Sequence, residues 1–168
     1  HVGLTLAVLA GGIIFYTYAE TLRLSGKSVY IISALTIISS RRRDMGHFVL
    51  GPVTLGLGAM IALMLYPEPA ASIAIYALAF GDGFSSLVGK LFGRIRIPLT
   101  GGKTLAGCSA CFVAVFIASY AILGDLTPSL IIALSAMIFE AMPTQDLDNI
   151  LLPVGTGFVA AQIIPLFA

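Results

Sequence analysis

Charge is scarce in this chain, and tryptophan is absent. Only 10% of the 168 residues are charged, and the formal net charge is +1. Soluble domains carry about 25% charged residues, so the composition argues against an ordinary soluble domain. A nearly neutral chain also offers little electrostatic attraction to a polyanion. We therefore expect no nucleic acid among its partners.

Cysteine is also rare, and the two cysteines, Cys108 and Cys111, form a CxxC pattern inside an apolar run. A zinc or redox site of this kind normally needs a second Cys or His pair or a suitable fold context. No such pair accompanies them, and His1 and His47 are isolated in the sequence. We interpret both cysteines as small residues that pack between helices.

Apolar residues are abundant instead: 58% of the chain is hydrophobic, in long continuous runs. A helix of about 20 apolar residues crosses the hydrocarbon core of a bilayer. The run at 29–38 is too short to cross, and we interpret it as an interfacial or re-entrant helix. We expect an all-α, polytopic transmembrane helix bundle that forms one integral-membrane domain over residues 1–168. Its six predicted spans lie at about 2–22, 47–66, 70–92, 105–123, 128–142 and 150–167.

The basic residues support this layout. If 29–38 does not cross, all nine Lys and Arg residues lie on one side of the membrane, and the connections at 66–69 and 124–129 contain none. The positive-inside rule makes that side cytoplasmic. All the acidic residues except Glu68 and Asp125 share it. We therefore expect a polar site at the boundary between membrane and cytoplasm. Because the chain starts at His1, directly before an apolar segment, we also expect further sequence upstream.

The stretch AFGDGFSSLVGKLFGR (79–94) places polar residues inside an apolar run. Drawn as a helix at about 100° per residue, it separates into an apolar face and a polar stripe about 140° wide. The stripe consists of Asp82, Ser85, Ser86, Gly89, Lys90 and Gly93. Charged groups at membrane depth are costly and are usually functional. The alternative is an Asp82–Lys90 pair that only helps the bundle to pack.

Two glycines flank the aspartate of this stripe. Gly81 and Gly83 weaken the helix around Asp82. Irregular backbone at membrane depth is tolerated where it lines a cavity. The sequence therefore predicts a helix break at this point, beside a cavity.

The stretch RIRIPLTGGKTLAG (94–107) favours an anion. It is not a P-loop, because Ile97 stands where the pattern needs its first glycine and no strand precedes it. Gly101 and Gly102 leave backbone amides accessible, and Lys103 and Thr104 open a helix whose N-terminus attracts phosphate. Arg94 and Arg96 add positive charge. The alternative is an ordinary basic anchor of a membrane span.

The stretch FEAMPTQDLDNILLP (139–153) collects carboxylates at a helix–helix junction. Glu140 precedes the helix breaker Pro143, and the residues Asp146, Asp148 and Asn149 precede the next helix. Mg²⁺ is typically held by one or two carboxylates together with substrate phosphates and water. A metal or nucleotide site is the favoured interpretation, and simple capping of the second helix is the alternative.

Two basic stretches near the N-terminus have simpler explanations. Glu20 and Arg23 are spaced i,i+3 and suit an ion pair on one helix face. The run RRRD (41–44) suits an anchor for anionic lipid headgroups. A role of that run in binding substrate phosphate is the alternative.

Taken in order, ETLRL, SRRRD, LAFGDGFSSLVGKLFGR, GGKTLAG and EAMPTQDLDNILLP resemble the CTP-dependent lipid kinases. That family includes dolichol or polyprenol kinase, phytol kinase and the CTP-dependent diacylglycerol kinase, and it is related to phosphatidate cytidylyltransferases. The resemblance covers most of the chain. One position departs from it: Ala106 stands where the family commonly has glutamate before the glycine.

The resemblance implies roles for individual residues. Asp82, Lys90 and Asp148 would be catalytic, and Asp82, Glu140 and Asp148 would hold Mg²⁺. Either Asp82 or Asp148 would accept the hydroxyl proton. The residues implied to bind the nucleotide or its phosphates are Gly81, Gly83, Ser85, Lys90, Arg94, Gly102, Lys103, Thr104 and Asn149.

The implied function is transfer of the γ-phosphate of CTP to the hydroxyl of a membrane lipid alcohol. Polyprenol, phytol, dolichol and diacylglycerol all fit, with the active site of this single catalytic domain at the cytoplasmic face of the bilayer. CTP as donor rests on the resemblance alone. A phosphatidate cytidylyltransferase and a membrane transporter or channel are the alternatives. The glycine-rich helix faces would also suit a homodimer, and the sequence leaves the oligomeric state open.

Overall fold

The computed structural model describes residues 2–26, 47–144 and 147–167. The predictions for the short helix at 29–38, for the run 41–44 and for Asp146 fall outside these residues. Within them the chain forms helices joined by short loops, together with one antiparallel bridge between Arg96 and Thr104.

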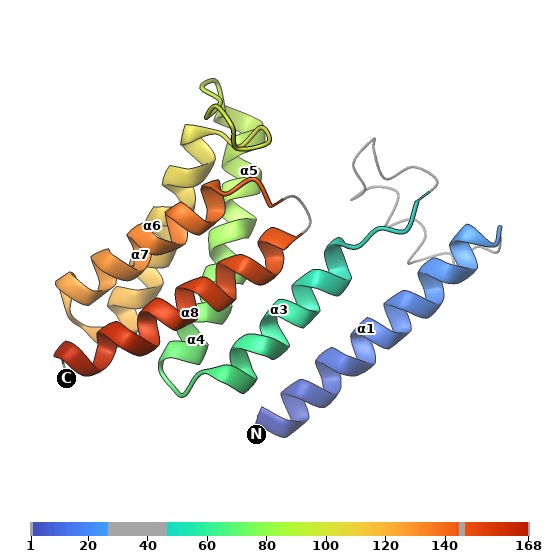
Figure 1. Cartoon of the computed structure of the whole chain (residues 1–168), viewed down its shortest axis with the longest axis horizontal. Coiled ribbons are helices and arrows are strands. Elements are labelled where there is room, and N and C mark those ends of the chain that lie inside the picture. Colours follow the sequence, from blue (N-terminus) through green and yellow to red (C-terminus); the bar gives the residue numbers. More distant parts are fainter. Residues whose placement is uncertain (1, 27–46, 145–146, 168) are drawn as a thin grey trace. The chain divides into compact units, whose positions relative to one another are not determined.

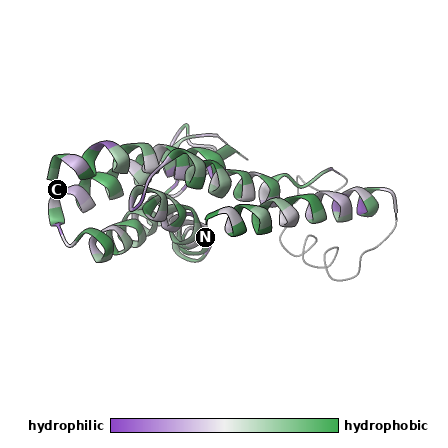
Figure 2. Cartoon of the chain, turned by 90° about the horizontal axis from the view of Figure 1, so that it is seen from below, coloured by the Kyte–Doolittle hydropathy of each residue, from purple (hydrophilic) through white to green (hydrophobic). Residues whose placement is uncertain are grey.

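The helices match the predicted spans closely. They are α1 (Val2–Leu24), α3 (Gly51–Leu65), α4 (Ala70–Tyr76), the π-helical segment η2 (Ala77–Asp82), α5 (Gly83–Phe92), α6 (Leu105–Leu123), α7 (Leu126–Ala141) and α8 (Asp148–Phe167). Four stretches are long and apolar enough to cross a membrane: 2–24, 70–92, 105–123 and 148–167. The helices α3 and α7 are shorter and also apolar. The all-α prediction is confirmed, and the helices are those of a membrane bundle (Figures 1 and 2).

The chain divides into two compact units, residues 1–57 and 58–168. In the first unit, the predicted Glu20–Arg23 pair forms with 2.7 Å between Oε1 and Nη2. Glu20 is fully buried and also accepts a hydrogen bond from the backbone of Val49 at 3.0 Å. Arg23 donates to the carbonyl of His47 at 2.9 Å, and the hydroxyl of Tyr16 donates to the carbonyl of Val49 at 3.0 Å. These bonds fasten the segment before α3 to α1.

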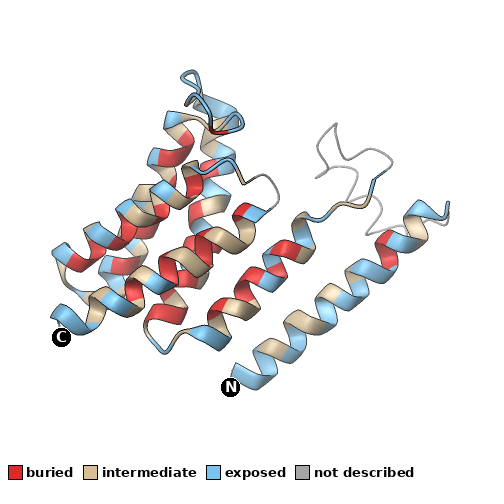
Figure 3. Ribbon diagram, viewed as in Figure 1, coloured by how far each residue is buried: buried red, intermediate tan, exposed pale blue. Residues whose placement is uncertain are grey.

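The second unit is a bundle of α4 to α8. Its helix α6 packs on α5 and α7, and α8 packs on α7 and α4. Small residues dominate its core, which explains how the helices approach closely without a large hydrophobic interior. The buried residues of the core cluster are Ala70, Ile73, Ala77, Cys111, Val115, Ile132, Ala133, Ala136, Leu152 and Ala160. Figure 3 shows buried residues in red along the helices of this unit.

The two cysteines behave as packing residues. Cys108 and Cys111 are buried and carry free thiols. Among the described residues, no group of three or more His, Cys, Asp or Glu side chains is arranged to hold a metal ion.

The helix that carries Asp82 is continuous from 70 to 92, so the predicted break is absent. A π-helical segment, residues 77–82, takes its place. Gly81 is needed here for packing, because a Cβ would lie 3.1 Å from Val115 Cγ2 and 3.2 Å from Cys111 Sγ. Gly83 faces open space. Single-turn π segments inside α-helices occur frequently at functional sites.

The other glycines of the stretch bring α5 against the start of α6. A Cβ on Gly89 would lie 3.0 Å from Thr104 Oγ1, and one on Gly93 would meet Thr104 Cγ2 at 2.6 Å. Gly107 faces α5 from the other side, where a Cβ would lie 2.9 Å from the carbonyl oxygen of Ser85. The apolar face of α5 points outward, since Phe84, Leu87, Leu91 and Phe92 are exposed. The inner face of α5 therefore carries only part of the predicted polar stripe, at Ser85, Gly89 and Gly93, while Ser86 and Lys90 are exposed.

This contact predicts different effects for two glycine-to-alanine changes. Gly107→Ala places a methyl group against the backbone of α5 and should lower the free energy of unfolding by roughly 1–3 kcal/mol. At Gly83, where a Cβ would meet nothing within 4 Å and φ is a helical −58°, the change Gly83→Ala should be neutral or stabilising. Thermal unfolding of both variants in the same detergent measures the difference. Equal shifts of Tm would contradict the close approach of α5 and α6.

Candidate functional site

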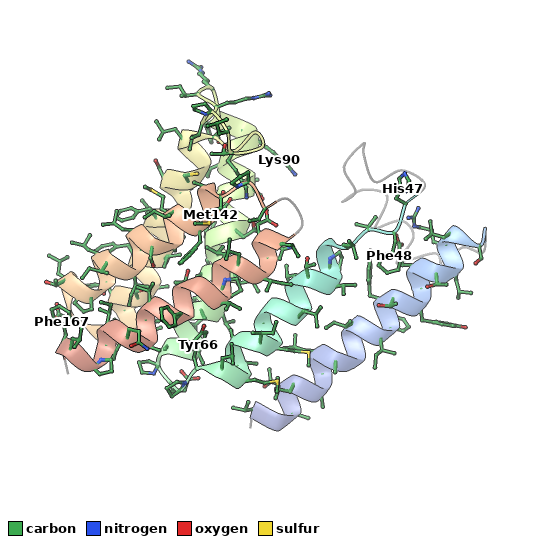
Figure 4. All side chains as sticks on the ribbon, viewed as in Figure 1. His47, Phe48, Tyr66, Lys90, Met142 and Phe167 are labelled. Carbon is green, nitrogen blue, oxygen red and sulfur yellow. The ribbon has the colours of Figure 1, made fainter. Side chains whose placement is uncertain are left out.

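A lysine held by two carboxylates lies at one end of the second unit. Lys103 Nζ donates to Glu140 Oε1 at 2.7 Å and to Asp148 Oδ2 at 3.1 Å. Lys103 precedes α6, Glu140 belongs to the last turn of α7, and Asp148 begins α8. Because α6 and α7 are consecutive helices joined by a short turn, the start of α6 lies beside the end of α7. Figure 4 labels Lys90 and Met142, which lie at this end of the unit.

Glu140 is the most deeply buried member of the cluster, with 1% of its surface exposed. Its Oε1 accepts a second hydrogen bond from the hydroxyl of Ser85, at 2.6 Å. Its Oε2 is buried and has no hydrogen-bond partner. A buried polar atom of this kind calls for an explanation, and an unfilled ligand position is one. Glu140 thus has one carboxylate oxygen without a hydrogen-bond partner beside the ammonium group of Lys103.

Asp148 is buried at the N-terminus of α8. Its Oδ1 accepts a bond from the backbone N–H of Asn149 at 3.1 Å, while Oδ2 faces Lys103. A carboxylate is favoured at this end of a helix because the unpaired amides carry partial positive charge. The capping interpretation of Asp148 and its membership of the site are thus compatible.

The charge of Lys103 is maintained by its partners. Burial alone lowers the pKa of a lysine, because it removes water from the ammonium group. The carboxylates of Glu140 and Asp148 outweigh burial, so the pKa of Lys103 lies above its usual value. The ammonium therefore stays protonated wherever the bundle is folded near neutral pH.

A short hairpin positions Lys103. The backbone N–H of Ile97 donates to the carbonyl of Lys103 at 2.9 Å, and Leu105 donates back to Ile95 at 3.0 Å. Gly101 and Gly102 form the turn with φ values of 69° and 103°, which other residues adopt only with strain. Thr104 then caps α6, since its Oγ1 accepts the N–H of Gly107 at 3.1 Å. The helix N-terminus is thus satisfied in part by the chain's own side chain.

The structure brings together only part of the predicted site. Ser85, Lys103, Glu140 and Asp148 form one bonded cluster, with Thr104 and Asn149 directly beside it in the chain. Asp82 is half-buried at the end of η2, one turn before Ser85. As stated for the described residues, no group of three acidic side chains assembles. The three predicted Mg²⁺ ligands Asp82, Glu140 and Asp148 therefore do not form a preformed cage.

The remaining predicted residues lie at the edge of this cluster or outside it. Lys90 and Arg94 are exposed. Gly81 packs in the core, Gly83 is open, and Gly102 belongs to the hairpin turn. Sequence reasoning placed Lys103 with phosphates and Glu140 with a metal, and it missed the direct bond between them. Their positions in the chain are 37 apart, and no local pattern links them.

Comparisons with known proteins point in one direction. A probable chloroplastic phytol kinase of Triticum aestivum is 26% identical over 153 residues, covering 80% of this chain and 51% of the relative. A chloroplastic farnesol kinase of Arabidopsis thaliana is 28% identical over 142 residues, covering 75% and 46%. Phytol kinase 1 of the same plant, also chloroplastic, is 24% identical over 155 residues, covering 82% and 51%.

The chain thus spans about half the length of the curated relatives it matches. No family model and no solved structure matches it. The similarity confirms the predicted resemblance to phytol and polyprenol kinases. The relatives' names mention kinases of prenyl alcohols and give no nucleotide donor.

The buried cluster predicts strong coupling between Lys103 and Glu140. Lys103→Met leaves Glu140 buried without a counter-charge and should cost roughly 2–4 kcal/mol of unfolding free energy. Adding Glu140→Gln should recover much of this loss, because the amide carries no charge. Chemical unfolding of the two single variants and the double variant gives the coupling. Lys90→Met, at an exposed position, is the control and should change stability by less than about 0.5 kcal/mol. Additive single effects would contradict the ion pair.

The raised pKa of Lys103 predicts how this contribution varies with pH. Because the folded pKa lies above the unfolded value of about 10.4, the stabilisation is complete below that value. It is lost as pH rises through the folded pKa. The stability difference between the wild type and Lys103→Met should therefore be constant from about pH 8 to about pH 10 and then shrink. Unfolding measured across this range tests it, and a difference that grows above pH 10 would refute the assignment.

Proposed function

We propose that this chain is the catalytic core of a kinase that transfers the γ-phosphate of CTP to the hydroxyl of a membrane prenyl alcohol. The observation that carries the proposal is the buried Glu140, whose Oε1 holds Lys103 while Oε2 has no partner. The similarity to a phytol kinase and a farnesol kinase supports the substrate class. CTP as donor is carried over from the resemblance to the CTP-dependent lipid kinases alone.

Phosphoryl transfer needs positioning and neutralisation of charge more than covalent chemistry. Lys103 is a fixed ammonium group with two carboxylate partners, and incoming phosphate oxygens can replace one of them. Lys90 lies on α5, and Arg94 lies at the start of the hairpin that follows it. Both side chains are exposed and can reach a nucleotide from solvent. Ser85 keeps Glu140 oriented through its 2.6 Å bond.

The residues present fit a Mg²⁺ ion. Glu140 and Asp148 are two hard oxygen donors next to one another, and Glu140 Oε2 is the orphaned atom such an ion would satisfy. These two residues would hold it, with Asp82 as the third candidate. When bound, Mg²⁺ would supply neutralisation of the β- and γ-phosphate charge.

The proton of the lipid hydroxyl requires an acceptor. Asp148 bonds Lys103 and is one of the two residues that would hold Mg²⁺. Asp82 lies on the helix whose outer face is apolar and exposed, and it is half-buried. This position suits a group that meets a substrate arriving from the bilayer. We therefore propose Asp82 as the base, with Asp148 as the alternative.

The site is proposed to face the cytoplasm. The four basic residues of the second unit, Lys90, Arg94, Arg96 and Lys103, belong to the end that carries the cluster. The turns at the other end, 66–69 and 124–125, contain none. The positive-inside rule supports this orientation.

One labelling experiment tests the reaction. The chain is reconstituted with Mg²⁺ and phytol or farnesol, and CTP is labelled at either the α- or the γ-phosphate. Label should reach the lipid from the γ position alone. Transfer from the α position would identify a cytidylyltransferase instead. Transfer from γ-labelled ATP but not from γ-labelled CTP would overturn the assignment of CTP as the donor.

Variants at matched acidic positions belong to the same test. Asp82→Asn should reduce kcat at least about 100-fold, as expected when a general base is lost, with Tm unchanged. Asp125→Asn is the control at the other end of the bundle. Asp125 caps α7 by accepting the N–H of Thr127 at 2.9 Å, and asparagine can keep that bond. Normal turnover in Asp82→Asn would remove Asp82 from the mechanism.

A further inference from the structure

The hairpin that delivers Lys103 has a tip that the reaction does not use. Its arms are joined by the bridge between Arg96 and Thr104 and by the two backbone bonds described above. The hydroxyl of Thr100 donates to the carbonyl of Ile97 at 2.7 Å and closes the turn. The tip is therefore an ordered structure, held by its own hydrogen bonds.

Leu99 at this tip is unusual in two respects. It is 94% exposed, and its φ is 66°. A leucine in the left-handed region is strained, because its Cβ crowds the following carbonyl. Gly101 and Gly102 adopt positive φ in the same turn without that strain. Residues held in sparsely populated backbone conformations cluster at functional sites, so the exposed Leu99 side chain is a candidate contact for a surface outside the chain.

The surroundings of Leu99 extend the lipid-facing surface of α5. Leu91 and Phe92 end that helix with exposed side chains, and Ile95 on the outgoing arm is 65% exposed. The helix over 70–92 is long and apolar enough to cross a membrane. The hairpin follows directly on this candidate span, and exposed apolar side chains recur on it at Ile95 and Leu99, with the exposed Arg94 between Phe92 and Ile95. Arg96, also exposed, lies between Ile95 and the tip.

We infer that this hairpin tip is inserted in the interfacial region of the bilayer. Leu99 and Ile95 lie among the upper acyl chains, and Arg96 binds lipid headgroup phosphate. Apolar side chains of interfacial segments enter about 5–10 Å below the headgroups, with basic residues at the phosphates. Exposed apolar residues that alternate with basic ones directly after the apolar face of α5 favour a lipid surface over a second protein. The exposed tip favours lipid over closure onto the chain.

Insertion has a consequence for the cluster behind the tip. The return arm of the hairpin carries Lys103, whose Nζ bonds Glu140 and Asp148. Anchoring the tip therefore holds this ammonium group at a fixed depth, at the boundary where a lipid hydroxyl would arrive. The insertion itself does not depend on the proposed reaction.

Depth-dependent fluorescence quenching tests the inference. The variant Leu99→Cys, in a background of Cys108→Ala and Cys111→Ala, carries the probe NBD in vesicles of phosphatidylcholine and phosphatidylglycerol. Leu134→Cys, on an exposed position midway along α7, gives the reference for the hydrocarbon core. The glutathione adduct of the probe gives the reference for water.

Lipids spin-labelled high on the acyl chain should quench the probe at position 99 strongly, and iodide should quench it several-fold less than the adduct. Iodide quenching equal to that of the adduct would overturn the inference. Quenching that depends on protein density would assign the tip to contacts between copies instead. Loss of lipid quenching on adding CTP would assign it to a lid over the nucleotide. Either result would also overturn the inference.

A second measurement removes the probe from the tip, since NBD is itself apolar. With the probe at Ile95→Cys, the change Leu99→Asn should abolish quenching by lipid, while Leu99→Met should preserve it. Asparagine tolerates positive φ, so the turn is kept. Raising the fraction of phosphatidylglycerol should increase quenching, and Arg96→Gln should remove that increase. Equal quenching in the Asn and Met variants would overturn the role of Leu99.

Discussion

The burial of one negative charge, on Glu140, organises the second unit. A carboxylate with 1% of its surface exposed is tolerated only if a cation and hydrogen-bond donors accompany it. Lys103 and Ser85 meet that requirement, and each depends on a different element. Lys103 needs the hairpin that returns the chain to α6, and Ser85 needs α5 to lie close to α6. The glycines at 89, 93 and 107 permit that approach.

The same requirement explains why the cluster suits a charged ligand. The bundle has already met the cost of desolvating the ammonium group and both carboxylates, and it keeps Glu140 Oε2 without a partner. A nucleotide with its metal would exchange one set of charge contacts for another. Under the proposed function, the bonded cluster of Ser85, Lys103, Glu140 and Asp148 is the arrangement of the site before a ligand binds.

Hydropathy and charge order were enough to predict much of this molecule. The spans at 70–92 and 105–123 coincide with the helices, and Ser85, Gly89 and Gly93 of the polar stripe lie on the inner face of α5. Each of these features follows from a pattern of apolar and polar residues within one helix. The Lys103–Glu140 bond and the packing role of Gly81 involve other helices, so no local period reports them. The predicted break at Gly81 and Gly83 was wrong because glycine alone does not distinguish a break from a π-helical turn.

The π-helical turn at 77–82 allows two registers to coexist on one continuous helix. One surplus residue in an α-helix rotates everything that follows it by about 100° relative to everything before it. Ile73 and Ala77 thus pack in the apolar core, while the later part of the same helix is rotated so that Ser85 faces Glu140. The number of residues in this π-helical turn therefore sets the rotation of residues 83–92, which carry the polar side chains, relative to residues 70–76, which pack in the core. Inserting or deleting one residue in this turn would change the direction in which the polar side chains of α5 point, although none of those side chains would itself be altered.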